Sequence, residues 1–471
     1  MHRARSQPRT RIAGLLLGML IALSACERDP TPVVSPPPAR NLHLEGDEAV
    51  AQAITLHTHA LPDLFDAIAQ SDRPSQDPRI AALRDTASEG LDPELRALLQ
   101  SAVAHFDDSH LHGDDDARLR DFAHRWNLRQ AELNLPTRLV HQTREHHGHH
   151  SYAPQTFVIE ARQLIDINRR PVEVEWRRRL DQGALAGPPT FYAPEVGVPA
   201  VYTDRALRTV QEHILPMLSD TPNKRHAARR EALRAELRLH LNDQLDPLLA
   251  SLHHREALAR TERAINAAGA RCTSPFRLPP MPPRGYAPET LQRLKARAAT
   301  LSAKGCDVLT ASHLDALTSH SQALQRSPEL DRSLAELLRL LLIQQAGLAA
   351  THALLATYDA GDRAPCSHAY CDGLTLLEQA EVAAYLGATS RGELPTTLMV
   401  MLCRDHRYGS AEVASAWLRL LRDADLSCDA PWPEDATQRL AELASAHIPV
   451  ALNVAPHAPP ALADLPTPRA R

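Results

Sequence analysis

The stretch LLRLLLIQQAGLAATHALL at residues 337–355 is the longest apolar run of the chain, and it predicts the centre of the fold. A serine, a proline and a glutamate at 327–329 precede it, the pattern of a helix N-cap with proline at the first helical position. Arg339, Gln344 and Gln345 interrupt the run with polar side chains. We therefore predict a central buried helix rather than a membrane span.

Helical patterns extend outward from this run in both directions. Aromatic residues make up only 4% of the chain, while alanine and leucine dominate, a composition that favours helices over strands. A second proline-capped start at Asp92 leads into LRALLQSAVAHF, whose apolar residues recur on one helical face. Residues 222–268 predict a long helix, broken or kinked at Asp246-Pro247. The sequence thus predicts an all-α fold of two packed helical subdomains with proline-rich connecting loops.

Irregular segments divide the chain. The loop 272–287 is rich in proline and follows a long helix, so we place a domain boundary there. It separates a histidine-rich helical subdomain at 41–271 from a cysteine-bearing helical subdomain at 272–448. A proline-rich tail at 449–471 follows, which we expect to be disordered beyond about Pro456.

The N-terminus carries an export signal. Residues 1–25 start with a basic segment that contains four arginines, and a short apolar segment follows it. This order is typical of a signal peptide, and the apolar segment is too short to span a bilayer. The segment ends in Leu23-Ser24-Ala25-Cys26, which resembles the lipobox of bacterial lipoproteins. This resemblance implies a lipid thioether on Cys26 and cleavage before it, so the partner of Cys26 would be a lipid bilayer.

The residues after Cys26 indicate where the protein is displayed. By similarity to Gram-negative lipoproteins, Glu27 favours the outer membrane, and the protein would face the periplasm. Residues 26–40 form the lipidated cysteine and a proline-rich tether, which would hold the body tens of ångströms from the membrane. The mature chain has 48 basic and 57 acidic side chains, a net charge of about −9, which argues against nucleic acid as a partner.

The other six cysteines all lie in the second half of the chain. An even number in an oxidising compartment predicts disulfides, and no pair has the CxxC spacing of a metal site. If helices at roughly 372–388, 393–404 and 410–426 run up, down and up, Cys403 and Cys428 lie too far apart to be bridged. We therefore predict the pairs Cys371–Cys403, Cys272–Cys306 and Cys366–Cys428.

A first histidine cluster lies at residues 105–116. His105, His110 and His112 stand there among several aspartates, and such side chains bind zinc, copper or harder cations. The same residues also suit a helix end, a turn at Gly113 and the acidic first turn of the next helix. We interpret the segment as a solvated turn, with a metal site as the alternative.

A second cluster lies at residues 141–150. On a helix, Glu145 would face His149 and His146 would face His150, with His141 near Glu145, and this face would bind zinc or copper. The pattern differs from HExxH, because the glutamate precedes the histidines. We interpret it as an exposed histidine patch, with specific metal binding as the alternative.

The loop 184–202 is the irregular segment most typical of a contact site. Phe191, Tyr192 and Tyr202 offer rigid aromatic contact area, and Glu195 stands in a turn that a partner could approach. The alternative is a connection between domains that packs on the body.

No catalytic signature is present in the sequence: it has no GxSxG, no P-loop, no GxGxxG and no HExxH, and we assign no catalytic residue. The sequence favours a membrane-anchored periplasmic lipoprotein that acts as a binding or interaction protein, such as a scaffold, an inhibitor or an immunity-type partner of an envelope enzyme. The main alternative is a metal-binding protein or metal-dependent hydrolase that uses the histidine clusters, and a small-molecule carrier is a third.

Overall fold

The computed structural model describes residues 40–41, 48–71, 76–105, 113–141, 143–146, 149–152, 154–181, 189–192, 197–218, 227–272, 275–279, 281–282, 284–357, 364–391, 394–404, 411–428, 432–433, 435–448 and 452–460. The signal peptide, Cys26 and nearly all of the tether lie outside these residues.

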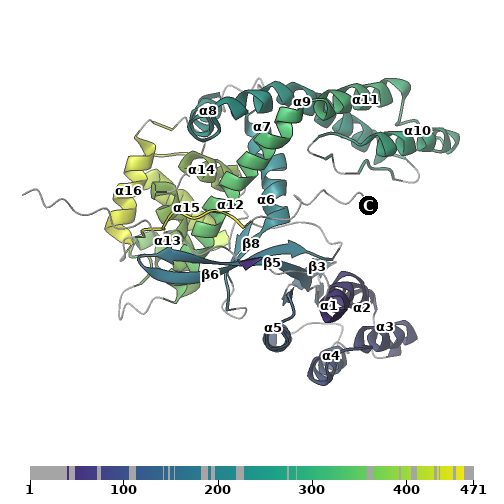
Figure 1. Cartoon of the computed structure of the whole chain (residues 1–471), viewed down its shortest axis with the longest axis horizontal. Coiled ribbons are helices and arrows are strands. Elements are labelled where there is room, and N and C mark those ends of the chain that lie inside the picture. The colour runs from purple at the N-terminus through teal and green to yellow at the C-terminus, as the bar shows by residue number, and fades with distance from the viewer. Residues whose placement is uncertain are drawn as a thin grey trace, which may run out of the picture. The chain divides into compact units, whose positions relative to one another are not determined.

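The central helix is α12, which runs over Pro328–Ala356. It contacts strands of a sheet on one side and α13 (Leu376–Arg391) on another (Figure 1). Among the described helices it is the one long and apolar enough to cross a bilayer, but 89% of its most apolar window is buried within the protein. The predicted buried helix is confirmed.

The prediction of an all-α fold is wrong, because the helices surround a six-stranded mixed sheet. Its two long strands are β5 (Gln155–Ile167) and β6 (Arg170–Arg179). Asn168 and Arg169 join them with φ angles of 54° and 64°, the pair of positive values that a two-residue type I′ hairpin requires. Valine, isoleucine, phenylalanine and tryptophan are concentrated in these strands, so their local composition outweighs the helical average of the chain.

Shorter strands complete the sheet in the order β1-β5-β6-β8-β7, with β2 also paired to β5. These strands are β1 (Arg40–Asn41), β2 (Thr137–Val140), β7 (Thr190–Phe191) and β8 (Ala200–Tyr202). The pairing of β6 with β8 is parallel, and the other pairings are antiparallel. The helix α12 contacts β5, β6, β7 and β8, so the sheet and the central helix share one core.

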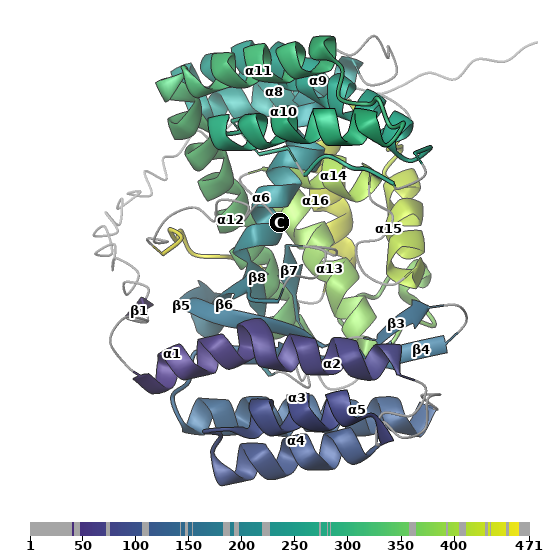
Figure 2. The same cartoon turned by 90° about the vertical axis from the view of Figure 1, so that its right-hand side faces the viewer.

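The N-terminal helices pack around a separate hydrophobic cluster that includes Trp126 and Leu139. They are the π-helix η1 (Leu56–Ala60), α2 (Leu61–Gln70), α3 (Pro78–Ser88), α4 (Pro93–His105) and α5 (Gly113–Glu132), and α1 (Glu48–Thr55) leads into η1. The predicted cap of α4 is confirmed, because the Asp92 carboxylate accepts hydrogen bonds from the backbone of Glu94 and Leu95. Figure 2 shows α1 and α2 running along one side of the sheet.

A connecting group of helices follows the sheet. It consists of α6 (Thr203–Thr209), the π-helix η3 (Val210–Ile214), α7 (Leu215–Leu218), α8 (Ala227–Leu241), the 3-10 turn η5 (Asn242–Gln244) and α9 (Leu245–Gly269). The break predicted at Asp246-Pro247 falls a few residues earlier, where Asn242 has a φ of 47°. Pro247 lies in the first turn of α9, where a missing N–H costs nothing.

The proline-rich segment after Cys272 leads into α10 (Pro288–Ala303) and α11 (Ala311–Gln325). Figure 2 shows α9, α10 and α11 packed side by side. The predicted disulfide Cys272–Cys306 is confirmed, with the two Cα atoms 5.4 Å apart. It joins the end of α9 to the turn between α10 and α11.

The other two predicted pairs are wrong, because the structure joins Cys366 to Cys371 and Cys403 to Cys428. The helices here are α14 (Pro395–Arg404), α15 (Ala411–Asp423) and α16 (Ala436–His447). The helix α14 contacts α8, η3 and α13, and it does not form the assumed antiparallel pair with α15. The disulfide joins the last turn of α14 to the segment that follows α15, with the Cα atoms of Cys403 and Cys428 5.2 Å apart.

The tail is ordered further than predicted. Residues 452–460 lie against β5 and α12: Ala455 donates its N–H to the Asp166 carbonyl, and the Gln163 amide donates to the Ala458 carbonyl. A nitrogen of His457 lies 3.0 Å from the Ile343 carbonyl of α12. The expected disorder beyond Pro456 is therefore wrong for the described residues up to Pro460.

The largest hydrophobic cluster draws on both sides of the boundary predicted at residues 271 and 272. Trp176 and Leu237 contribute to it from before this boundary, and Leu341, Tyr385 and Trp417 from after it. The core that packs on α12 is therefore shared by the two predicted subdomains.

Candidate functional site

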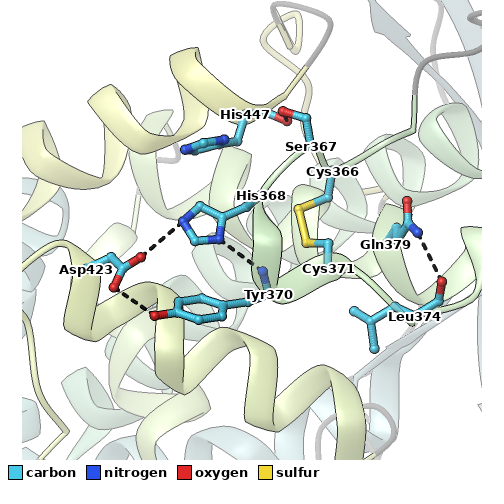
Figure 3. Close-up of a disulfide and its surroundings, with 9 residues drawn as sticks. All are labelled: Cys366, Ser367, His368, Tyr370, Cys371, Leu374, Gln379, Asp423 and His447. Carbon is cyan, nitrogen blue, oxygen red and sulfur yellow. Dashed lines mark hydrogen bonds and ion pairs between the residues drawn. A yellow bond between two sulfur atoms is a disulfide. The ribbon is translucent and has the colours of Figure 1, made fainter.

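A short loop closed by the disulfide Cys366–Cys371 carries a cluster of polar and aromatic side chains (Figure 3). The loop ends in the 3-10 turn η6 (Ala369–Cys371) and leads into α13. Both cysteines are buried, whereas Ser367 and Ala369 between them are exposed. The disulfide therefore fixes the base of a loop whose tip faces solvent.

His368 uses both of its ring nitrogens, one within the loop and one to hold the loop to α15. Its Nδ1 accepts a hydrogen bond of 3.2 Å from the backbone N–H of Tyr370, so it carries no proton in this arrangement. Its Nε2 lies 3.1 Å from the Asp423 carboxylate, to which it donates. The Tyr370 hydroxyl donates to the other carboxylate oxygen of Asp423, also at 3.1 Å, so one acid orients both side chains (Figure 3).

A third helix meets the loop at His447, near the end of α16. The His447 carbonyl accepts hydrogen bonds from the backbone N–H and the hydroxyl of Ser367, and its ring lies edge-on to that of His368, with 4.4 Å between centroids. Burial, and then the neighbouring His368, lower the pKa of His447. The ring of His447 therefore stays neutral to lower pH than an isolated histidine.

The loop and the segments next to it expose aromatic, basic and apolar side chains. The Arg419 guanidinium lies over the Tyr370 ring, 5.1 Å from its centroid. Arg419 and Arg422 are both exposed on α15. Leu376, the first residue of α13, is 65% exposed, which is unusual for a leucine that begins a packed helix. We call these four residues and Ala369 the loop surface.

This geometry does not form a nucleophilic dyad or triad. Both nitrogens of His368 are engaged, so the ring has no free lone pair with which to take a proton from a substrate. The Ser367 hydroxyl donates to a carbonyl rather than to an imidazole. These bonds hold the loop in one arrangement against α15 and α16.

A second polar cluster lies inside the sheet around Glu175, which has no exposed surface. The Glu175 carboxylate forms ion pairs with Arg138 at 2.7 Å and with Arg177 at 2.6 Å, and the Arg162 guanidinium lies 3.5 Å away. Burial by itself raises the pKa of Glu175, but the arginines together outweigh it, and the pKa lies below its usual value. These side chains form a buried cluster of ion pairs, here called the ionic lock, which joins β2, β5 and β6.

The structure places few of the histidines predicted as metal ligands. His110 and His112 lie outside the described residues, and His105 ends α4. Among the described residues, no group of three histidine, cysteine, aspartate or glutamate side chains is arranged to hold a metal ion. Zinc or copper binding at residues 105–116 stays a prediction.

The second histidine cluster is a hairpin rather than a helix. It consists of β3 (Thr143–His146) and β4 (His149–Tyr152), and its backbone register pairs Glu145 with His150 and His146 with His149. The helical spacing assumed for these residues is therefore wrong. Thr143 pairs with Tyr152, and β-branched and aromatic residues at such positions favour strands. The half-buried His141 precedes the hairpin.

The aromatic contact site predicted in the loop 184–202 is wrong for its described tyrosines. Tyr192 is buried against the ring of His352, and Tyr202 is 1% exposed, stacked on Phe157 at 4.7 Å and covered by Arg205. Phe191 lies in β7, and Glu195 is outside the described residues. Where the structure describes it, at 189–192 and 197–202, the segment is thus mainly a packed connection, the alternative interpretation of the sequence.

Sequence reasoning missed His368 and Asp423, because they lie 55 positions apart and meet only after α13, α14 and α15 have packed. The short spacing of Cys366 and Cys371 was the available signal for a closed loop at this place. Comparison of the chain with known protein families, with curated proteins and with solved structures found no match.

Proposed function

We propose that this chain is an envelope-anchored binding protein that presents the loop surface to a protein partner. A lipid on Cys26 would hold it in the outer membrane, and the tether would let its body reach a partner in the periplasm. The export signal supports this location, and so do the disulfides, which persist in oxidising compartments.

The observation that carries the proposal is the fixed shape of an exposed loop. The disulfide, the bonds of His368 and the bond of Tyr370 to Asp423 all restrict the loop before any partner arrives. A loop that is already ordered loses little conformational entropy on binding. Tyrosine and arginine are also the residues that most often dominate binding energy at protein interfaces.

The side chains of the loop surface indicate the chemistry of the partner. Arg419 and Arg422 would pair with acidic residues of the partner, and the exposed Leu376 would enter an apolar pocket. The partner is therefore a protein face with an apolar centre and acidic residues around it.

Site-specific crosslinking in cells tests this proposal. A photoreactive residue at Ala369 or Leu376 should give the same discrete adduct, because both lie in the loop surface. The matched control is Leu239, which is 80% exposed on α8. Replacing Cys366 and Cys371 with serine should abolish the adduct while the protein remains folded by circular dichroism. Identical adducts from Leu239, or none from Ala369 and Leu376, would contradict the proposal.

The anchor is tested separately. Metabolic labelling with palmitate should mark the wild-type chain, and Cys26→Ser should remove the label and release the protein from the membrane fraction. An unlabelled wild-type chain would refute the lipid anchor and leave the crosslinking result to be judged by itself.

A further inference from the structure

A pair of histidines joins α9 and α11 at a place that takes no part in the loop surface. The Nδ1 atoms of His254 and His320 lie 3.1 Å apart. The ring of His253 lies next to that of His254, but its own Nδ1 is 2.7 Å from the Ala250 carbonyl, to which it donates. Two imidazole nitrogens from different helices thus point at each other.

The elements that carry this pair are held firmly. The disulfide Cys272–Cys306 closes the unit of α9, α10 and α11. Ser321, the residue after His320, accepts a hydrogen bond from the backbone N–H of Tyr286. Gly285 has a φ of 74°, and a Cβ there would lie 2.8 Å from the Ser321 Cα, so this contact admits glycine alone. The position of His320 is therefore set by its surroundings.

The surroundings of His254 favour the neutral form of its ring. Burial, and then the neighbouring His253 and His320, lower the pKa of His254. In the neutral pair, one Nδ1–H donates to the lone pair of the other Nδ1. A neutral imidazole is also the form that binds a transition metal.

We propose that His254 and His320 bind a late divalent transition-metal ion through their two Nδ1 atoms. Metal–nitrogen bonds of about 2.0–2.1 Å across a gap of 3.1 Å give an angle at the metal of about 95–100°. This angle lies between the values for square-planar and tetrahedral coordination. Each ring would have to turn about its Cβ–Cγ bond, so that its Nδ1 lone pair leaves the line between the two nitrogens and points at the metal. The hydrogen that one ring carries on Nδ1 moves to Nε2, so both Nδ1 lone pairs become available without loss of a proton.

The site supplies two protein ligands, because no group of three donors converges among the described residues. Water would complete the coordination. Two imidazoles with open positions favour Cu²⁺ over Zn²⁺, following the general order of divalent-metal affinity. This inference does not depend on the proposed function and uses none of its residues.

The test is a titration of the full chain in detergent with CuCl₂, without a polyhistidine tag. The variant His146→Ala with His150→Ala serves as the background, so that the predicted histidine patch does not contribute. We expect one tight Cu²⁺ per chain, with two nitrogen ligands in its electron paramagnetic resonance spectrum. His254→Gln or His320→Gln should weaken this binding about tenfold or more. Glutamine keeps a hydrogen-bonding side chain at each position.

Two controls make the result decisive. His253→Ala, on the same helix, and His59→Ala, an exposed histidine of η1, should retain the tight site. Circular dichroism of each variant checks that it is folded, and zinc should bind the wild type more weakly than copper. Tight binding that persists in the double variant His254→Gln with His320→Gln, or its absence from the wild type, would overturn the proposal.

Discussion

Glu175 and its arginines stabilise the sheet from within, whereas the six paired cysteines all lie after residue 271. Residues 41–271 contain no cysteine at all, so the first region relies on non-covalent contacts. In the second region, Cys272–Cys306 and Cys403–Cys428 each span a helix, and Cys366–Cys371 closes a short loop. Disulfides therefore fix the irregular segments beside helices in the second region, whereas a buried cluster of ion pairs joins neighbouring strands in the first.

The largest loss of stability should come from removing the Glu175 carboxylate, the acid of the ionic lock. Glu175→Gln leaves Arg138 and Arg177 buried without their counter-charge, and should lower the free energy of unfolding by about 3–5 kcal/mol. Urea denaturation followed by circular dichroism measures this loss. The matched control is Glu173→Gln on the same strand, where a half-exposed ion pair should contribute less than about 1 kcal/mol. Equal losses of unfolding free energy in the two variants would mean that burial does not make the ion pairs of Glu175 more important for stability than that of Glu173.

The second prediction concerns the cross-linked region. In the loop-entropy treatment of disulfides, the separation of 34 residues in Cys272–Cys306 corresponds to about 4 kcal/mol, and the separation of 5 in Cys366–Cys371 to about 2 kcal/mol. Paired cysteine-to-alanine variants, compared by urea denaturation in oxidising buffer, should show this order. If the short loop contributes as much as the long one, contacts within the loop and not chain entropy account for its effect.

The disulfides show how far sequence reasoning reaches. The pair Cys272–Cys306 was predictable because both cysteines flank one compact helical unit. The other two pairs depended on the directions of α14 and α15, which are set by contacts with α8 and α13. Glu236 of α8, for example, accepts hydrogen bonds from the backbone of Thr396 and Thr397 at the start of α14. Such a long-range cap leaves no periodic signal in the sequence.

The same reasoning explains the sheet and the loop surface. The buried helix α12 followed from its own apolar run, but the strands were hidden by a composition averaged over the whole chain. The turn Asn168-Arg169 between runs rich in β-branched residues was the local signal that mattered. For the loop surface, the closeness of Cys366 and Cys371 was visible, whereas the partnership of His368 with Asp423 was not.

The third prediction uses one histidine from each region, the fully buried His57 and the partly buried His352. Burial lowers the pKa of His57 and of His352 from 6.5 to about 4. Between pH 6.5 and 4 the unfolded chain binds a proton at each position that the folded chain does not bind. The free energy of unfolding should therefore fall as the pH is lowered through this window, by about 3 kcal/mol for each histidine.

Single variants separate the two contributions. The His57 ring donates to the Ala53 carbonyl and accepts from the Trp126 indole, and His57→Gln keeps one donor and one acceptor. His57→Gln and His352→Gln should each flatten part of the pH dependence of urea midpoints, and the exposed His59→Gln should leave it unchanged. An unaltered pH profile in both buried variants would assign the acid sensitivity to carboxylates.

The smallest expected effect compares the same local feature in both regions. The Asp77 carboxylate caps α3 by accepting the N–H of Arg79, and the Thr310 hydroxyl caps α11 by accepting the N–H of His313. Asp77→Ala and Thr310→Ala should each lower the free energy of unfolding by about 1 kcal/mol, because a cap acts on its own helix end. Thermal denaturation with and without a reductant measures the loss of stability that each variant causes. If the cost of Thr310→Ala rises sharply once the disulfides are reduced while that of Asp77→Ala does not, the cross-links, rather than the cap, hold the first turn of α11 in place.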